Sequence, residues 1–116
     1  MNGSVLNIQQ IRNGSVCVVA IEGRIDSSNA MDLMLALNTV FSSGETVILV
    51  DLSSVLYLTS AAFRVLLVAT DEAERRSGRL ALCNVTGHVR ELFEVSGLIS
   101  AFTVMGSREE AVAQLS

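Results

Sequence analysis

Two short runs near the start of the chain are rich in apolar residues, which predicts a pair of β-strands. The runs cover residues 5–11 and 16–21, and Asn13 and Gly14 lie between them. An Asn-Gly dipeptide between two strand-like runs favours a hairpin, because both residues tolerate positive φ. The sequence therefore predicts a fold that opens with an antiparallel β-hairpin.

The segment after the hairpin has the spacing of an amphipathic helix. Its apolar positions recur at intervals of three and four residues, at Ala30, Leu33, Met34, Leu37, Val40 and Phe41. Asp26, Ser27 or Ser28 can cap this helix at its start, and Ser-Ser-Gly at 42–44 ends it. One face of the predicted helix is apolar and suited to cover a sheet.

A continuous apolar run at 46–52, "TVILVDL", is typical of a strand in a parallel sheet that is covered on both faces. After it the sequence predicts a loop and then a helix from about Ser60 to Ser77, ended by Gly78. A strand at 79–84, a helix at 86–97 capped by Thr86 and a strand at 101–105 follow. The final predicted element is a helix with a capping box of Ser107 and Glu110. Right-handed crossovers then give an α/β fold, with a mixed, mostly parallel β-sheet, an N-terminal β-hairpin and about four helices.

The composition supports one compact domain over residues 1–116, since half of the residues are apolar and Pro and Trp are absent. The net charge is -4, and all eight basic residues are scattered arginines, which argues against a nucleic acid partner. No apolar run approaches the roughly 20 residues that span a bilayer, and no signal peptide begins the chain. We therefore expect a cytoplasmic protein without direct membrane insertion.

Familiar enzyme motifs are missing from the sequence. It contains no GxGxxG, no GxxxxGK[ST] and no GxSxG, so a phosphate-binding loop or a nucleophile elbow is not indicated. The single histidine, His88, fits a solvent-facing helix position. Cys17 and Cys83 lie in apolar runs without a CxxC motif and fit buried thiols. We expect a protein that is not an enzyme and that needs no cofactor or metal.

The helix that begins near Ser60 presents two different faces when its residues are projected at 100° each. The residues expected to face the sheet are Ala62, Val65, Leu66, Ala69 and Ala73. The residues of the opposite stripe are Ser60, Arg64, Asp71 and Arg75. Leu67 and Val68 flank this stripe and are poorly buried by the geometry. An exposed stripe of mixed character suits a contact with another protein.

Ser60 has two possible roles at the start of this helix. As an N-cap its oxygen would accept a bond from a free backbone N–H, which stabilises a helix by about 1 kcal/mol. As a phosphate acceptor it would gain about -1.5 to -2 charges at the favourable end of the helix dipole, one turn from Arg64. The fold would tolerate this phosphate, so its effect would fall on whatever binds the surface.

Three blocks of the sequence resemble the STAS domain of bacterial anti-sigma-factor antagonists. They are "VAIEGRIDSSNA", "VILVDLSSVLYLTSAAFRVLL" and "GRLALCNVTGHVRELFEVSGLISAF", and together they cover nearly the whole chain. The first contains the Gly-x-ϕ-Asp segment that closes the second strand in that family. The resemblance implies a single STAS domain over residues 1–116.

The resemblance also implies a role in a partner-switching module of transcription regulation. In such a module the antagonist binds an anti-sigma factor that is also a serine kinase, the kinase phosphorylates the antagonist and breaks the complex, and a serine phosphatase resets it. The phosphorylated serine of the family corresponds to Ser60. The neighbouring family surface corresponds to Asp26, Ser27 and Asn84, and with the exposed stripe this gives a predicted partner contact of Asp26, Ser27, Thr59, Arg64, Leu67, Val68 and Asn84.

The sequence departs from the family motif around the serine. Thr59 replaces the common acidic residue before it, and Ala61, Ala62 and Phe63 replace the small-Gly-Leu continuation. Thr59 is therefore a second candidate for phosphorylation. The alternative function is a non-phosphorylated STAS scaffold, or an interaction subunit of a transport or sensory complex, in which Ser60 is only a helix cap.

Overall fold

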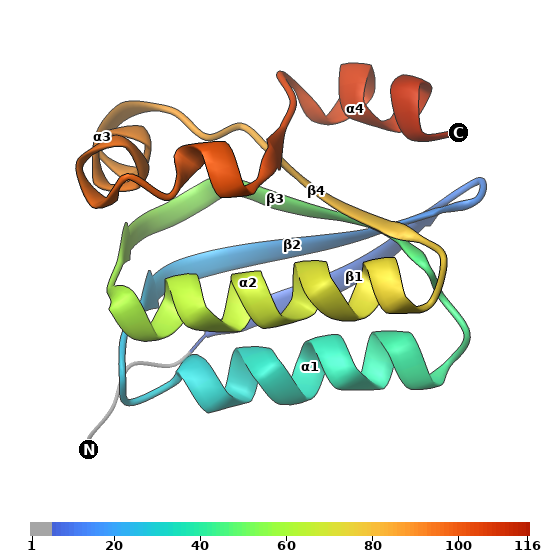
Figure 1. Ribbon diagram of the computed structural model, residues 1–116, viewed down its shortest axis with the longest axis horizontal. Helices are drawn as coiled ribbons and strands as arrows, with labels where there is room; N and C mark the ends of the chain where they lie inside the picture. Colours follow the sequence, from blue (N-terminus) through green and yellow to red (C-terminus); the bar gives the residue numbers. More distant parts are fainter. Residues whose placement is uncertain (1–5) are drawn as a thin grey trace.

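Five strands form one sheet in the order β1-β2-β3-β4-β5, with helices against both faces (Figure 1). The structure is a computed structural model and describes residues 6–116. Its strands are β1 (Asn7–Asn13), β2 (Val16–Ile25), β3 (Val47–Leu58), β4 (Arg79–Cys83) and β5 (Thr103–Val104). Its helices are α1 (Ala30–Ser42), α2 (Ser60–Arg75), α3 (Gly87–Ser96) and α4 (Arg108–Leu115), and a 3-10 turn covers Ile99–Ala101. Because β1 pairs antiparallel with β2 and the other neighbouring strands are parallel, the predicted mixed sheet is confirmed.

The predicted hairpin forms, with its turn one residue later than the Asn-Gly dipeptide suggested. Asn13 pairs with Val16, so the loop between the strands consists of Gly14 and Ser15. Gly14 has a φ of 63°, and Ser15 has no positive φ. A glycine with positive φ at the first of two loop positions is the arrangement of a type II′ turn, whose twist matches that of the strands. Val5, the first residue of the predicted strand, lies outside the described residues.

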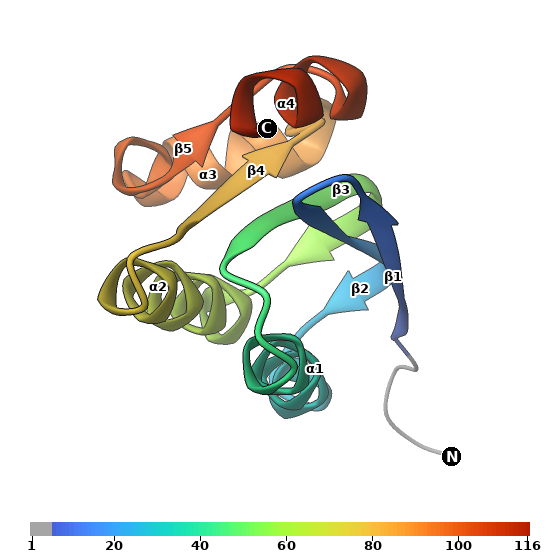
Figure 2. The same cartoon turned by 90° about the vertical axis from the view of Figure 1, so that its right-hand side faces the viewer.

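Side chains of the sheet alternate between two apolar cores, one on each face. The larger core combines residues such as Val19 and Val50 with the apolar stripes of α1, α2 and α3. In the smaller core, Ala111 and Leu115 of α4 pack with Leu49. Figure 2 shows α1 and α2 on one side of the sheet and α4 on the other. The apolar run in β3 is therefore covered on both faces, as predicted.

The turn before α1 is built around a buried asparagine. Asn29 is 1% exposed, its Oδ1 accepts from the Asp26 N–H at 2.9 Å, and its Nδ2 donates to the carbonyl of Arg24 at 2.8 Å. The prediction that Asp26, Ser27 or Ser28 caps the helix is wrong, because α1 begins only after Asn29. The asparagine side chain spans the turn and fixes the end of β2 to the start of the helix.

Strand β3 is longer than the predicted strand at 46–52. It continues through residues 53–58, which were expected to form a loop, and ends one residue before Thr59. Only Val47–Asp51 pairs with β4, whereas the later residues pair with β2 alone. The extended strand therefore carries the start of α2 out to the end of β2, where Ile25 pairs with Leu58.

Helix α2 ends earlier than predicted, and Gly78 has a different role. The helix ends at Arg75, and Ser77 adopts the left-handed conformation with a φ of 62°. A Cβ atom at Gly78 would collide with the carbonyl oxygen of Thr46, which also accepts the Arg79 N–H at 2.9 Å. Glycine at this position permits the close approach of the chain to the start of β3.

We expect Gly78→Ala to lower the free energy of unfolding by about 1–3 kcal/mol, because the new methyl group forces the backbone of Thr46 to move. Urea denaturation measures the change. The matched variant Ser77→Gly should not destabilise, since glycine adopts the left-handed conformation of Ser77 without steric cost. Equal stability of Gly78→Ala and the wild type would contradict the assignment.

Candidate functional site

The start of α2 is tied to the end of β2 by backbone hydrogen bonds. Thr59 has extended backbone, and its N–H donates to the carbonyl of Ile25 at 3.0 Å. The carbonyl of Thr59 in turn accepts the N–H groups of Ala62 and Phe63, at 3.0 and 3.2 Å. Thr59 is thus the residue that joins strand to helix, and Ser60 is the first helical residue.

The hydroxyl of Ser60 is exposed and forms no hydrogen bond with any residue between 6 and 116. The interpretation of Ser60 as an N-cap is wrong, because Thr59 occupies that position and neither hydroxyl accepts from the first turn. The hydroxyl of Thr59 is half-buried and lies 3.4 Å from the carbonyl oxygen of Ile25. Of the two neighbouring hydroxyls, that of Ser60 is the accessible one.

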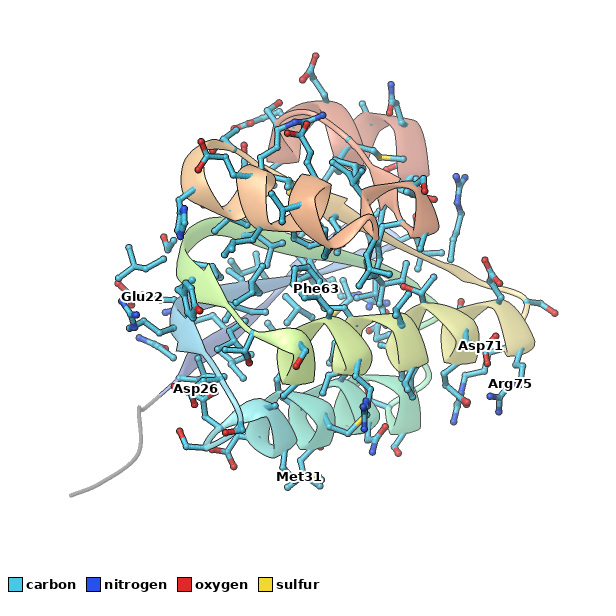
Figure 3. The ribbon with its side chains drawn as sticks, turned by 60° about the vertical axis from the view of Figure 1, so that its left-hand side comes forward. Glu22, Asp26, Met31, Phe63, Asp71 and Arg75 are labelled. Atoms are coloured by element: carbon cyan, nitrogen blue, oxygen red, sulfur yellow. The ribbon has the colours of Figure 1, made fainter. Side chains whose placement is uncertain are left out.

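The side chains of α2 divide between core and solvent as the helical projection predicts. The predicted buried set is buried, namely Ala62, Val65, Leu66, Ala69 and Ala73, and Phe63 joins it. The predicted exposed stripe is exposed, namely Ser60, Arg64, Asp71 and Arg75. Figure 3 shows Phe63 directed into the molecule, with Asp71 and Arg75 near the far end of the helix. Leu67 is half-buried and Val68 is 45% exposed, so the flanks of the stripe are apolar.

Two apolar grooves run along the sides of this stripe. The α2–α3 groove, of about 440 Å³, is lined by Ser60, Phe63, Arg64, Leu67, Leu92, Val95, Ser96 and Leu98. The α1–α2 groove, of about 390 Å³, is lined by Ser27, Ala30, Met31, Met34, Ser60, Ala61, Arg64, Val65 and Val68. Ser60 and Arg64 line both grooves and form the ridge between them.

Most of the predicted contact residues lie on this ridge or in these grooves. Ser27 and Val68 line the α1–α2 groove, and Leu67 lines the α2–α3 groove. Asp26 is half-buried at the turn before α1, where its carboxylate accepts the N–H of Ser28 at 2.9 Å (Figure 3). Asn84 lines neither groove.

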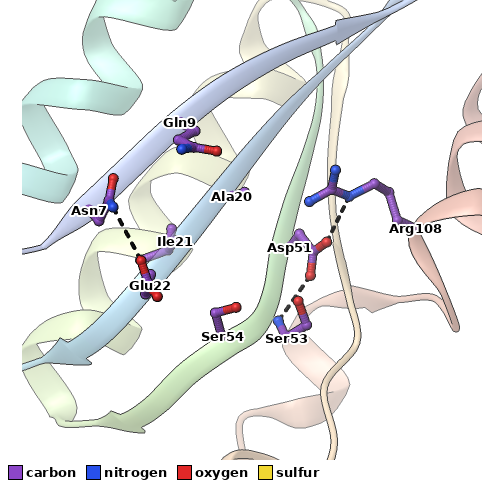
Figure 4. Close-up of a pocket in the computed structure, with 9 residues that line it drawn as sticks. All are labelled: Asn7, Gln9, Ala20, Ile21, Glu22, Asp51, Ser53, Ser54 and Arg108. Atoms are coloured by element: carbon purple, nitrogen blue, oxygen red, sulfur yellow. Dashed lines mark hydrogen bonds and ion pairs between the residues drawn. The ribbon is translucent and has the colours of Figure 1, made fainter.

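Asn84 belongs instead to a polar cluster near the start of α4. Its Nδ2 donates to Oδ1 of Asp51 at 3.1 Å, and Nε of Arg108 donates to Oδ2 of Asp51 at 2.8 Å. The N–H of Ser53 supplies a further bond to Asp51 at 2.9 Å. Figure 4 shows Asp51, Ser53 and Arg108 of this cluster at one side of a pocket on the α4 face of the sheet, where Asn7 also donates to Glu22.

Hydrogen bonding outweighs burial in setting the ionisation of Asp51. Burial by itself raises the pKa of this carboxyl group, since Asp51 is 3% exposed. The bonds from Ser53, Asn84 and Arg108 lower the pKa more, and the net effect is a pKa below the ordinary value. The charged groups of the cluster satisfy one another, so we assign it a structural role in holding α4 to the sheet.

Some of the groove residues were not predicted as a surface. Met31 is 66% exposed and Val95 is 87% exposed, and each adds apolar surface to one of the two grooves. Met31 falls outside the buried stripe of α1, so the helical spacing alone could have marked it. Leu92, Val95 and Leu98 could not be placed opposite α2 without knowing how α3 packs.

The other candidate chemical groups lie away from this surface or are buried. Cys17 and Cys83 are both buried, and burial raises the pKa of Cys83 to about 12, so this thiol stays protonated. His88 is exposed on α3, stacks on Tyr57 at 6.0 Å and faces Glu91. Residues 6–116 hold no group of three or more histidine, cysteine or acidic side chains placed for a metal ion. In the same range, every helix is too short or too polar to cross a membrane.

Comparison with known proteins relates the chain to one family. A family model described as "Mlab, STAS domain" matches residues 8–103. The chain is also 38% identical over 96 residues to BtrV of Bordetella bronchiseptica, which is named as a candidate anti-sigma factor antagonist, and the match covers 83% of each chain.

Solved structures share the fold. An anti-sigma factor antagonist from Mycobacterium paratuberculosis superimposes with a TM-score of 0.85 and 21% identity, over 96% of this chain and 94% of the other. The phosphorylated form of the Bacillus cell fate determinant SpoIIAA gives a TM-score of 0.72 and 22% identity, over 95% and 100%. Identities this low establish the arrangement of strands and helices only.

Proposed function

The chain belongs to the STAS domain family, and from this premise we propose that it is an anti-sigma factor antagonist whose binding is switched by phosphorylation of Ser60. The partner we propose is an anti-sigma factor that is also a serine kinase, with a serine phosphatase restoring the unmodified state. The relative BtrV supports the antagonist role by its name. The kinase and phosphatase steps are what the resemblance to this family implies, and the exposed position of Ser60 is compatible with them.

One observation supports this proposal above the others: exposed Ser60, whose hydroxyl forms no hydrogen bond within the described residues, lies on a ridge between two apolar grooves. Apolar grooves on a protein surface are typical of contacts with another protein. A kinase can reach this hydroxyl without unfolding the helix, because Ser60 is exposed and its side chain forms no hydrogen bond within residues 6–116. A modification there acts at the centre of the contact surface.

The phosphate would act on the partner more than on the fold. At the first position of α2 a dianion faces the positive end of the helix dipole and the free N–H groups of the first turn, so the helix tolerates it. Inside a contact that buries both grooves, the same dianion would lose its water and repel or displace the partner. We therefore propose that unmodified Ser60 permits binding and phosphoserine prevents it.

Ser60 is a better acceptor than Thr59 in this geometry. The threonine hydroxyl is half-buried beside the carbonyl of Ile25, whereas the serine hydroxyl is exposed. Transfer of a phosphoryl group to Thr59 would break the hydrogen bond from its hydroxyl to the carbonyl of Ile25. We propose Ser60 as the acceptor, despite the absence of an acidic residue before it.

Incubation with a serine kinase of the anti-sigma factor class and ATP tests the proposal. We expect intact-mass measurement to show the addition of one phosphate to the wild type and to Thr59→Val, and none to Ser60→Ala. Removal of the phosphate by a serine phosphatase would complete the cycle. Failure of every such kinase to modify Ser60 would instead favour the non-switching scaffold, in which the grooves bind a constant partner.

A further inference from the structure

We propose that Arg64 binds a carboxylate of the partner, and that a phosphate on Ser60 competes with that carboxylate for the same guanidinium group. The partner segment would present apolar side chains to the two grooves and an aspartate or glutamate to the ridge between them. This proposal deepens the proposed function and rests on it, since it describes the same surface.

The surface formed by the two grooves carries a single positive charge within the described residues. Among the residues that line either groove, within the described part of the chain, Arg64 is the one with an ionisable side chain. The remaining lining residues are apolar apart from three serines, Ser27, Ser60 and Ser96. A partner complementary to this surface is therefore apolar with one acidic group. A basic group opposite Arg64 would be repelled by it, and an apolar group there would leave the guanidinium charge buried and unpaired.

The guanidinium group of Arg64 has no acidic partner within the described residues. Five of the eight arginines pair with a carboxylate in the described structure, namely Arg12, Arg75, Arg76, Arg90 and Arg108. Arg64 is exposed and has no such pair within residues 6–116. Its planar guanidinium group is therefore free to form two parallel bonds with a carboxylate or a phosphate.

The spacing of the two residues gives the competition. Ser60 and Arg64 are one helical turn apart, with Cβ atoms roughly 5–6 Å from each other, which is the spacing of i,i+4 ion pairs. A phosphate on Ser60 would pair with the guanidinium group and occupy the bonds that the partner carboxylate needs. The partner would then face both an uncompensated negative charge and the loss of its own ion pair.

Phosphorus NMR tests the intramolecular pair without any kinase. Phosphoserine is installed at position 60 during translation, and the second pKa of the phosphate, ordinarily about 6, is measured by titration. We expect Arg64→Gln to raise this pKa by roughly 0.3 to 0.7, a two- to fivefold change in proton affinity. Arg75→Gln removes the same charge at a position roughly 22 Å from Ser60 along the helix and should leave the pKa unchanged.

Two synthetic peptides test the chemistry of the partner. Each is an amphipathic helix of about 18 residues, or five turns, with a leucine face bordered by glutamates in one peptide and by lysines in the other. In nitrogen–proton NMR titrations we expect the glutamate peptide to shift amides of the groove residues and to bind at least about threefold more tightly than the lysine peptide. Arg64→Gln and phosphoserine at position 60 should each abolish this difference, and Arg64→Lys should retain part of it.

Each alternative outcome overturns the proposal. A phosphate pKa that is the same in the wild type and Arg64→Gln would exclude the pair of Arg64 with phosphoserine. Equal binding of the two peptides, or no binding of either, would exclude an acidic partner segment. If the same amides shift with protein concentration in the absence of peptide, the grooves bind a second copy of the chain instead. Failure of the proposed function appears separately, as the absence of kinase-dependent phosphorylation of Ser60.

Discussion

Replacing Ser60 by aspartate is expected to weaken the complex with an anti-sigma factor by roughly tenfold or more, whereas Ser60→Ala should bind as tightly as the wild type. The alanine side chain adds no charge to the ridge between the grooves. Aspartate places one negative charge in the contact. The phosphoserine dianion should cost more, because Arg64 balances only one of its two charges, and a remaining buried, unpaired charge costs on the order of 3 to 5 kcal/mol. Calorimetric titration of the purified partner measures the dissociation constants of the wild type, Ser60→Ala, Ser60→Asp and the phosphoserine form.

A matched control separates the position of the charge from its presence. Ser100→Asp introduces the same group at an exposed residue that lines neither groove, and it should leave binding unchanged. The fold of Ser60→Asp should be intact, because an acidic residue in the first turn of α2 interacts favourably with the helix dipole. Equal affinity of Ser60→Asp and Ser60→Ala would refute a switch at this position.

The second large effect is expected at the polar cluster that holds α4. Asp51→Ala removes the acceptor for Arg108, Asn84 and the N–H of Ser53 at once. Breaking a buried pair from one side typically costs about 3–5 kcal/mol, so we expect the free energy of unfolding to fall by about this amount. As a control, Arg12→Met breaks the ion pair with Glu45, and because the Arg12 side chain is 62% exposed the stability should change little.

The contribution of Asp51 should also depend on pH. Its folded-state pKa is lower than its ordinary value, so ionised Asp51 stabilises the fold above the unfolded pKa of about 4. This contribution is lost as the pH falls through the lower, folded-state pKa. Urea denaturation of the wild type and Asp51→Ala at a series of pH values should therefore show a constant difference above about pH 5 and a shrinking difference below about pH 4. A difference that grows on acidification would contradict the assignment.

Local patterns were sufficient to predict much of this molecule. The helical spacing of α2 separated Ala62 and Leu66 from Ser60 and Arg64, because burial of a surface helix follows its own periodicity. The capping box of Ser107 and Glu110 was also predicted and is present, since both of its bonds lie within one turn. These features depend on residues that are close together in the chain.

Features that depend on distant residues were not predicted. Asp51 appeared within an apolar run, and nothing near it indicated Arg108, which is 57 positions away in the sequence. The length of β3 also escaped prediction, because its second half owes its strand conformation to pairing with β2. The two grooves depend on the packing of α1 and α3 beside α2, so a helical projection of one helix could identify only the ridge.

The second half of β3 pairs on one side only, so its hydrogen exchange should respond to a partner bound at the surface. Beyond Asp51 this strand has neighbouring hydrogen bonds only to β2, and it leads directly into Thr59 and Ser60. Its amides should therefore exchange with solvent deuterium faster than those of Val47–Asp51, through local opening that leaves the centre of the sheet intact. A partner bound across the ridge would suppress local opening of the second half of β3. Slower deuterium uptake at the amides of that half would then report that the surface is occupied.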